Sequence, residues 1–161
     1  GGGPAARRKL GDLHHVAAAS QLPVPLESAA YRQLLLGKEL LGYEADVVCL
    51  QELKCETGAF PYLEIEERGW NCAVHGQKSY NGVAILSKFP LEDVSKEMTT
   101  LKDDAARYIE ATVMSPRPVR VAGVYVPNGN PAPGEKYDYK LEWSEALEHQ
   151  AAQICAPNNR S

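Results

Sequence analysis

Long apolar runs are missing from this 161-residue sequence. No stretch approaches the ~18 consecutive apolar residues of a membrane-spanning helix, and residues 1–8 lack the apolar core of a secretory signal. We therefore expect an intracellular protein with no membrane partner, whose compartment (cytoplasm, nucleus or organelle) is not distinguished. Positive charge is not in excess either, because the net charge is −4. Nucleic acid is not held here by a general positive field, so any contact must be local or carried by a bound cation.

Cysteines are few and show no paired spacing: Cys49, Cys55, Cys72 and Cys155. Cys49 falls within an apolar run that predicts a buried strand, so free thiols in a reducing compartment are the simplest account. These positions indicate neither a zinc site nor a disulfide framework.

The most informative segment is 45–54, which reads ADVVCLQELK. An almost unbroken apolar run of this length predicts a strand buried on both faces. Glu52 stands at its end, where a carboxylate is costly to bury unless a cation or several donors meet it. Two interpretations are open from the run alone: an ion pair with Lys54, or a metal ligand.

Apolar periodicity and turn residues divide the chain into an irregular head and an alternating α/β body. Residues 1–24 mix glycine, alanine and proline without periodicity, so we expect a disordered tail. Helical spacing predicts helices at 29–43, 60–68 and 137–154, and strands are predicted at 70–74, 82–86, 107–113 and 119–126. The apolar positions of the last helix include Tyr137, Leu141, Ala146 and Leu147.

Five blocks, in order and at compatible spacings, resemble the exonuclease III family of abasic-site endonucleases. They are 50–54 (LQELK), 76–88 (GQKSYNGVAILSK), 107–111 (RYIEA), 124–129 (VYVPNG) and 136–143 (KYDYKLEW). The resemblance covers roughly 45–152, and ordered blocks are far more specific than one motif. It implies an α/β fold: the N-terminal half, incomplete, of the four-layer α/β sandwich of the endonuclease/exonuclease/phosphatase superfamily, over residues 25–161.

Several signatures of that family are not found in this sequence. There is no opening strand ending in Trp-Asn, no Gly-Asp-Phe-Asn block and no later Asp-His pair. In the family these complete the metal site and supply the catalytic acid and histidine. The resemblance therefore leads us to expect a fragment, a truncated gene product or a degenerate copy, with an apolar sheet face left uncovered. Self-association through that uncovered sheet is a further expectation.

The segment 30–46 is more similar to the deadenylase and 2′,5′-phosphodiesterase branch of the same superfamily, where a comparable helix precedes the Leu-Gln-Glu strand. From residue 53 onward the chain again resembles the abasic endonucleases. A fusion of related exons and chance similarity in a leucine-rich helix both remain open.

The resemblance assigns roles to two groups near the expected active site. It makes Glu52 a catalytic carboxylate and the ligand of Mg²⁺, with Mn²⁺ as an alternative, and Mg²⁺ does prefer hard oxygen ligands. It places Tyr125 beside the scissile phosphate as a second catalytic residue, with the amide of Asn128 donating to a phosphate. Taken alone, Tyr125 is equally a half-buried strand tyrosine, and Asn128 a good turn residue.

The resemblance also implies contacts with the DNA backbone. Tyr80, Asn81 and Gly82, with Lys78 nearby, form a loop that in the family lies beside the abasic site. Their own chemistry indicates first a turn before a strand. Arg107 resembles a family arginine near the substrate, although a strand-end arginine is often an ion-pair partner. His75 is given no catalytic role.

The function implied is that of a metal-dependent DNA phosphodiester hydrolase of base-excision repair. Its partners would be DNA with abasic sites or blocked 3′ ends, cut by endonuclease and 3′–5′ exonuclease activities. An RNA-directed phosphodiesterase or deadenylase of the same superfamily is one alternative. An inactive remnant or binding module is the other.

Overall fold

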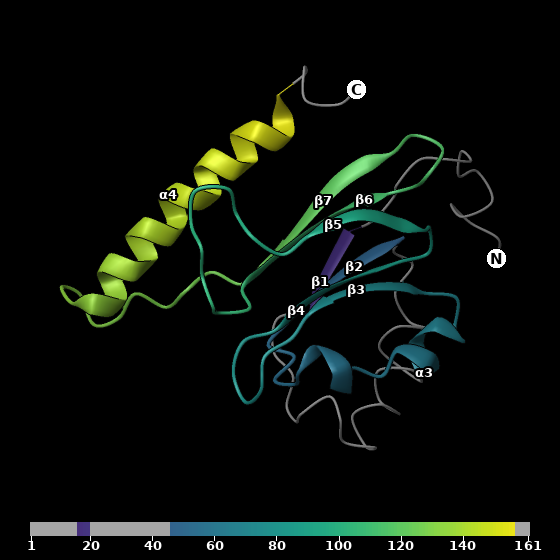
Figure 1. Cartoon of the computed structure of the whole chain (residues 1–161), viewed down its shortest axis with the longest axis horizontal. Coiled ribbons are helices and arrows are strands. Elements are labelled where there is room, and N and C mark those ends of the chain that lie inside the picture. Colours follow the sequence, from purple (N-terminus) through teal and green to yellow (C-terminus); the bar gives the residue numbers. More distant parts are fainter. Residues whose placement is uncertain (1–15, 20–45, 157–161) are drawn as a thin grey trace, which may run out of the picture.

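The computed structural model describes residues 16–19 and 46–156, and within them the strands form two sheets (Figure 1). The first sheet has the order β1-β2-β4-β3, with β1 at Val16–Ala19, β2 at Val47–Gln51, β3 at Asn71–His75 and β4 at Val83–Ser87. The second has the order β5-β6-β7, with β5 at Leu91–Ser95, β6 at Tyr108–Val113 and β7 at Val119–Val124. The helices are α3 at Tyr62–Glu66 and α4 at Glu135–Cys155, and a 3-10 turn spans Thr57–Ala59.

Strands β2 and β4 form the centre of the first sheet. They are antiparallel, with Val47 opposite Ser87, and β4 pairs with β3 on its other side. The side chains of both strands are buried almost throughout. This agrees with the apolar run 45–54 and its prediction of a strand covered on both faces.

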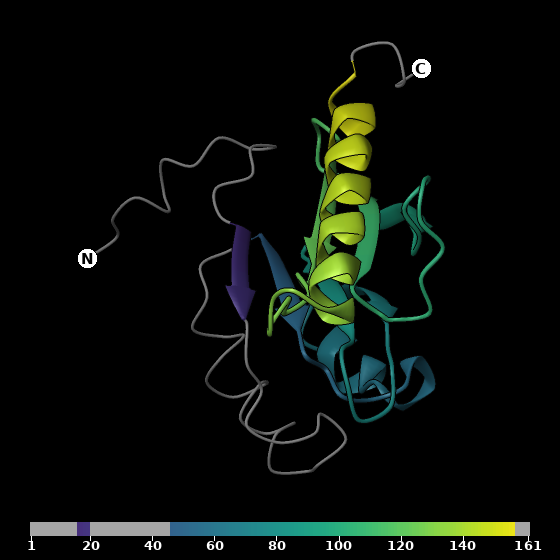
Figure 2. The same cartoon turned by 90° about the vertical axis from the view of Figure 1, so that its left-hand side faces the viewer.

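The two sheets pack against each other, and a helix covers the outer face of each (Figures 1 and 2). Side chains alternate along a strand, so Val47 and Cys49 meet Ile109 of β6 between the sheets. On the opposite face of the same strand, Val48 packs with Ile65 of α3. Helix α4 lies on the outer face of the second sheet, where Trp143 contacts Tyr108. The expected α/β sandwich is confirmed.

This layering corrects the expectation of an uncovered apolar sheet face. Within residues 46–156, apolar side chains of β2, β3 and β4 pack against those of β6 between the sheets, and α3 and α4 pack on the outer sides. We expected this chain to form one sheet and the other half of the family fold to supply the second. In the structure, strands of this chain form both sheets. Self-association of this chain stays a prediction.

Strand β1 corrects the predicted disordered tail at residues 16–19. It pairs in parallel with β2, with Val16 opposite Val47. A strand made by long-range backbone pairing leaves no periodic signal in an alanine-rich segment, so the sequence did not reveal it. The rest of 1–24, the predicted helix 29–43 and nearly all of the deadenylase-like segment 30–46 lie outside the described residues.

Most other elements occur where the sequence predicts them, with ends shifted by a few residues. Strand β5 was not predicted, because its middle residues, including Glu92 and Asp93, are exposed and break the apolar alternation. Helix α4 is present, and its buried side agrees with the prediction in part, because Ala146 is buried and Leu147 packs against the same cluster. Tyr137 and Leu141 are 38 % and 47 % exposed, and Trp143 is the residue that fills the core at 1 %.

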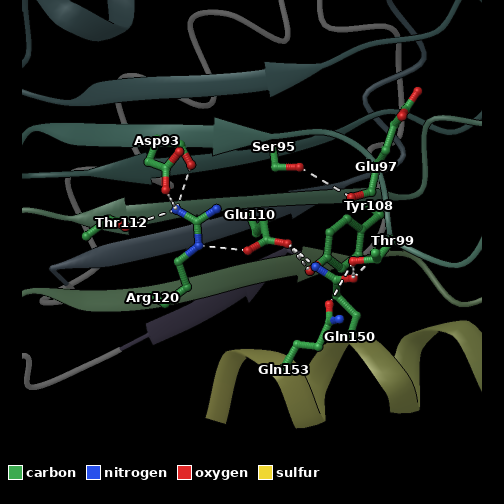
Figure 3. A network of polar contacts seen from close by, with 10 residues as sticks. All are labelled: Asp93, Ser95, Glu97, Thr99, Tyr108, Glu110, Thr112, Arg120, Gln150 and Gln153. Carbon is green, nitrogen blue, oxygen red and sulfur yellow. Dashed lines mark hydrogen bonds and ion pairs between the residues drawn. The ribbon is translucent and has the colours of Figure 1, made fainter. Parts of the chain in front are cut away.

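A polar network fastens the C-terminal half of α4 to the second sheet (Figure 3). The buried carboxylate of Glu110 on β6 accepts hydrogen bonds from Arg120 Nε at 2.7 Å, Tyr108 Oη at 2.9 Å and Gln150 Nε2 at 2.6 Å. Gln150 Oε1 in turn accepts from the backbone N–H of Thr99 at 2.8 Å. A buried charge that meets several donors is compensated, so the network holds helix to sheet.

No helix in the described residues is long and apolar enough to cross a membrane. Cys49 and Cys55 are buried, Cys72 is half-buried and Cys155 is exposed. Burial raises the pKa of the Cys49 thiol to about 11. Burial, with a smaller contribution from Glu66, raises the pKa of Cys72 to about 12. Both thiols therefore stay protonated at neutral pH.

Candidate active site

Glu52 lies in a tight backbone turn directly after β2. Both Glu52 and Lys54 have left-handed backbone angles, with φ of 54° and 55°. Leu53 between them is fully buried, and its N–H donates to the carbonyl of Gly82 at 3.2 Å. Lys54 N–H donates to the carbonyl of Asn81 at 3.0 Å. The turn is thus anchored to a second loop, which holds the Glu52 carboxylate in place at the sheet end.

Gly82 is required for this anchoring. Its φ is +96°, a conformation that L side chains rarely adopt. A Cβ at this position would lie 2.8 Å from the Cβ of Leu53. The Asn-Gly pair was predicted to form a turn, and the left-handed angles at Asn81 and Gly82 confirm it.

Tyr125, directly after β7 of the second sheet, contacts Glu52. It follows the last residue of β7, and its N–H donates to the carbonyl of Arg107 at 2.8 Å. Its ring packs against the core between the sheets, and its hydroxyl donates to Oε1 of Glu52, 73 residues away in sequence. The ends of β2 and β7 are also joined directly, because Gln51 Nε2 donates to the carbonyl of Val124 at 2.7 Å.

The electrostatics of this pair favour a protonated tyrosine. The hydrogen bond to Glu52 is the main cause that raises the pKa of Tyr125, with burial and the Glu52 charge adding to it and Arg107 opposing it. The hydroxyl is therefore a donor at neutral pH. Glu52 and Lys54 are both among the described residues, and no ion pair joins them. The alternative interpretation of Glu52, as the ion-pair partner of Lys54, is therefore not supported, and its partner is Tyr125.

Arg107 is half-buried and holds the backbone of Tyr125. Its Nη1 donates to the Tyr125 carbonyl at 3.2 Å, and its guanidinium carbon lies 4.9 Å from the centroid of the Tyr125 ring. The ring of Tyr139 on α4 lies on the same guanidinium, 5.9 Å away. The Nε of Arg107 is buried and has no hydrogen-bond partner among the described residues.

The side-chain amides of Gln77 and Asn81 stabilise the loop 77–82. Gln77 Oε1 accepts from Asn81 Nδ2 at 3.0 Å and from the Ala106 N–H at 2.9 Å. The amide of Asn81 is thus used inside the loop and is not turned toward a ligand. Tyr80 is 72 % exposed, and Lys78 and Ser79 are exposed as well, so these side chains are open to a partner.

Asn128, three residues beyond Tyr125, makes a local turn contact. It is exposed, and its Oδ1 accepts from the backbone N–H of Asn130 at 3.1 Å. This geometry matches the interpretation of Asn128 as a local turn former. His75, given no catalytic role, contacts the carbonyl of Tyr108 through Nδ1 at 3.0 Å.

Sequence reasoning missed two residues that border the site, since Tyr139 contacts Arg107 and Asp103 binds Tyr139. Asp103 and Tyr139 are joined by a hydrogen bond from the tyrosine hydroxyl to Oδ2. Asp103 lies in a loop without periodic signal, and Tyr139 lies in a helix whose apolar positions were assigned to other residues. The only available signal was the resemblance of the block 136–143.

Glu52 is the carboxylate that the structure offers to a divalent cation where β2 ends. No group of three His, Cys, Asp or Glu side chains that could hold a metal forms among residues 46–156. Glu52 is half-buried at the rim, and Tyr125 occupies only its Oε1. One carboxylate on a rigid turn fits Mg²⁺, which keeps several waters and needs few protein ligands.

Comparison with known proteins agrees with this architecture. The Endonuclease/Exonuclease/phosphatase family matches residues 13–161. The chain belongs to this family. An exodeoxyribonuclease of Bacillus subtilis is 36% identical over 107 residues, which cover 65% of this chain and 40% of that protein.

Two solved structures share the fold of this family member. One is the 3′ phosphatase NExo from Neisseria bound to a product DNA hairpin, with a TM-score of 0.68, 35% identity and coverage of 84% of this chain and 49% of that one. The other is an AP endonuclease from Archaeoglobus fulgidus, with a TM-score of 0.71, 30% identity and coverage of 88% and 51%. The chain therefore spans about half of the length of the structures it matches.

Proposed function

We propose that this chain carries the phosphate-facing part of a metal-dependent DNA phosphodiester hydrolase. The observation that carries the proposal is the hydrogen bond from Tyr125 to Glu52, which brings a phenol and a carboxylate together where the two sheets end. The names of the relatives, exodeoxyribonuclease and AP endonuclease, support the same chemistry. A DNA-bound neighbour supports DNA as the partner.

Glu52 is the proposed ligand of Mg²⁺, with Mn²⁺ as the alternative. When bound, the ion would neutralise charge on the phosphate and activate a water. Glu52 would hold it from a rigid turn, while Tyr125 keeps its proton and donates a hydrogen bond to Glu52 or to a phosphate oxygen. Arg107 fixes the backbone that carries Tyr125 and brings positive charge next to the site.

The exposed side chains of the loop 77–82 are the proposed contacts to the DNA backbone. Lys78 offers a cation and Tyr80 an exposed ring, and such contacts position a duplex without reading its sequence. Asn81 and Gly82 shape this loop, and the exposed amide of Asn128 would donate to the same or a neighbouring phosphate. The proposed substrates are DNA with abasic sites or blocked 3′ ends, as in base-excision repair.

A binding module is the second candidate, because the described residues form no group of three His, Cys, Asp or Glu side chains that could hold a metal. Removing members of a catalytic unit typically lowers rates by ~10³ or more. We therefore expect very weak or no incision by the 161-residue chain, against a full-length relative assayed in parallel.

The test is incision and binding of an abasic-site duplex in Mg²⁺, with an RNA oligonucleotide as a second substrate. Residual incision that Glu52→Gln and Tyr125→Phe abolish, and that Glu56→Gln on the same loop leaves intact, supports the hydrolase. Binding of the duplex without incision supports the binding module. Cleavage of RNA alone supports the RNA-directed alternative, and incision that survives Glu52→Gln overturns the site assignment.

A further inference from the structure

Tyr139 and Asp103 form a second tyrosine–carboxylate pair beside the first. The hydroxyl of Tyr139 on α4 donates to Oδ2 of Asp103, and Oδ1 of the same carboxylate accepts from the N–H of Ala105 at 3.0 Å. Burial, followed by the hydrogen bond and charge of Asp103, raises the pKa of Tyr139, so the hydroxyl keeps the proton that it donates. The pair ties the loop before β6 to helix α4.

Arg107 lies between the two tyrosines and links the pairs. Its guanidinium carbon is 4.9 Å from the ring centroid of Tyr125 and 5.9 Å from that of Tyr139. Its Nη1 donates to the Tyr125 carbonyl, while its Nε is buried without a partner among the described residues. Such a cation is stabilised by the faces of the two rings that it lies over, in addition to its hydrogen bond. If the Tyr139 ring moves, Arg107 loses one of these faces.

Helix α4 is itself anchored at a second point. Gln150 lies about three helical turns beyond Tyr139 and donates to the buried carboxylate of Glu110 at 2.6 Å (Figure 3). The helix is thus tied to the loop before β6 in its first turns and to the second sheet in its C-terminal half. Tyr139 is therefore presented from a rigid element, which gives it a defined position against Arg107.

We propose that Tyr139 and Asp103 are positioning residues, which hold Arg107 against Tyr125 and so keep the Tyr125 hydroxyl on Glu52. The consequence for DNA rests on the proposed function, whereas the effect on Arg107 does not. The competing account is that the Tyr139–Asp103 hydrogen bond only stabilises the fold.

The experiment follows the Arg107 side chain by NMR in the whole 161-residue chain. The Nε–H signal is assigned by its loss in Arg107→Lys, and its exchange with water is measured in four variants. Tyr139→Phe removes one hydroxyl, Asp103→Ala removes the acceptor and Asp103→Asn keeps an acceptor without the charge. Tyr137→Phe removes a hydroxyl from an exposed tyrosine on the same helix and is the matched control.

We expect Nε–H exchange to accelerate about tenfold or more in Tyr139→Phe and Asp103→Ala, the scale of one hydrogen bond to a charged group. The exchange rate in Asp103→Asn should lie close to that of the wild type, and Tyr137→Phe should leave it unchanged. A folded Tyr139→Phe variant, checked by circular dichroism, that exchanges like the wild type overturns the proposal. If Tyr139→Phe does not fold, the contrast between Asp103→Asn and Asp103→Ala decides the question, and equal exchange in these two overturns it.

A second readout is the affinity for an abasic-site duplex in Mg²⁺, measured by fluorescence anisotropy. Tyr139→Phe should weaken binding by about the same factor as it accelerates exchange, because both depend on the position of Arg107. If the wild type binds no DNA, the proposed function fails while the exchange data still decide the positioning role. If exchange accelerates and affinity does not change, Arg107 is positioned without consequence for DNA and that part of the proposal is overturned.

Discussion

Replacing Gly82 by alanine should destabilise the protein through two separable effects. The first is the backbone angle, since a left-handed conformation costs an L residue about 1–2 kcal/mol. The second is steric, because the new Cβ would lie 2.8 Å from the Cβ of Leu53, which is fully buried. Forcing extra atoms into a packed core typically costs about 1–3 kcal/mol. We therefore expect the free energy of unfolding to fall by roughly 2–5 kcal/mol.

Two other glycines separate these effects. Gly69 has a φ of +89° with no atom within 4 Å of an added Cβ, so Gly69→Ala isolates the backbone term. Gly58 has open space and no left-handed angle, so Gly58→Ala should be neutral or slightly stabilising through reduced entropy of the unfolded chain. Urea unfolding followed by tryptophan fluorescence measures all three variants.

The local consequence of the change can be measured as well. Displacing Leu53 breaks the hydrogen bond between Leu53 and Gly82, so the Glu52 carboxylate should move away from Tyr125. The pKa of Tyr125, which that hydrogen bond raises, should then fall toward its ordinary value in a ¹³C NMR titration. If Gly82→Ala costs no more than Gly69→Ala, the close contact with Leu53 is not a constraint and the account of the loop is refuted.

Further predictions concern metal, core and thiols. Titration with Mg²⁺ should shift the NMR signals of the backbone amides around Glu52 with a dissociation constant on the order of millimolar, as in low-affinity calcium-binding modules. Glu52→Gln should abolish this response, and shifts that persist in the variant would refute the metal site. Glu110→Gln should lower the free energy of unfolding by about 2–4 kcal/mol, because it breaks a buried charge pair. The control Glu92→Gln, at an exposed position of β5, should change it by less than ~0.5 kcal/mol. Equal effects of the two substitutions would contradict the stabilising role of the network in Figure 3. A thiol reagent at pH 8 should label exposed Cys155 much faster than Cys49, whose pKa is raised to about 11, and comparable rates would show that the sheet opens.

The sequence alone determined those features whose signal is local. The run before Glu52 predicted β2, because burial on both faces requires an unbroken apolar segment. The pair Asn81-Gly82 predicted a turn, because these residues tolerate left-handed backbone angles. The family and half of its sandwich also followed from the sequence, since ordered blocks carry information that no single motif has.

Tertiary structure decided how these local features meet. The partner of Glu52 is Tyr125 rather than Lys54, because packing of the two sheets brings the ends of β2 and β7 together. Asp103 and Tyr139 have no sequence pattern in common and meet only when α4 docks on the second sheet. Local patterns reach a few residues along the chain, whereas these contacts depend on which faces pack, and that choice is made by the whole core.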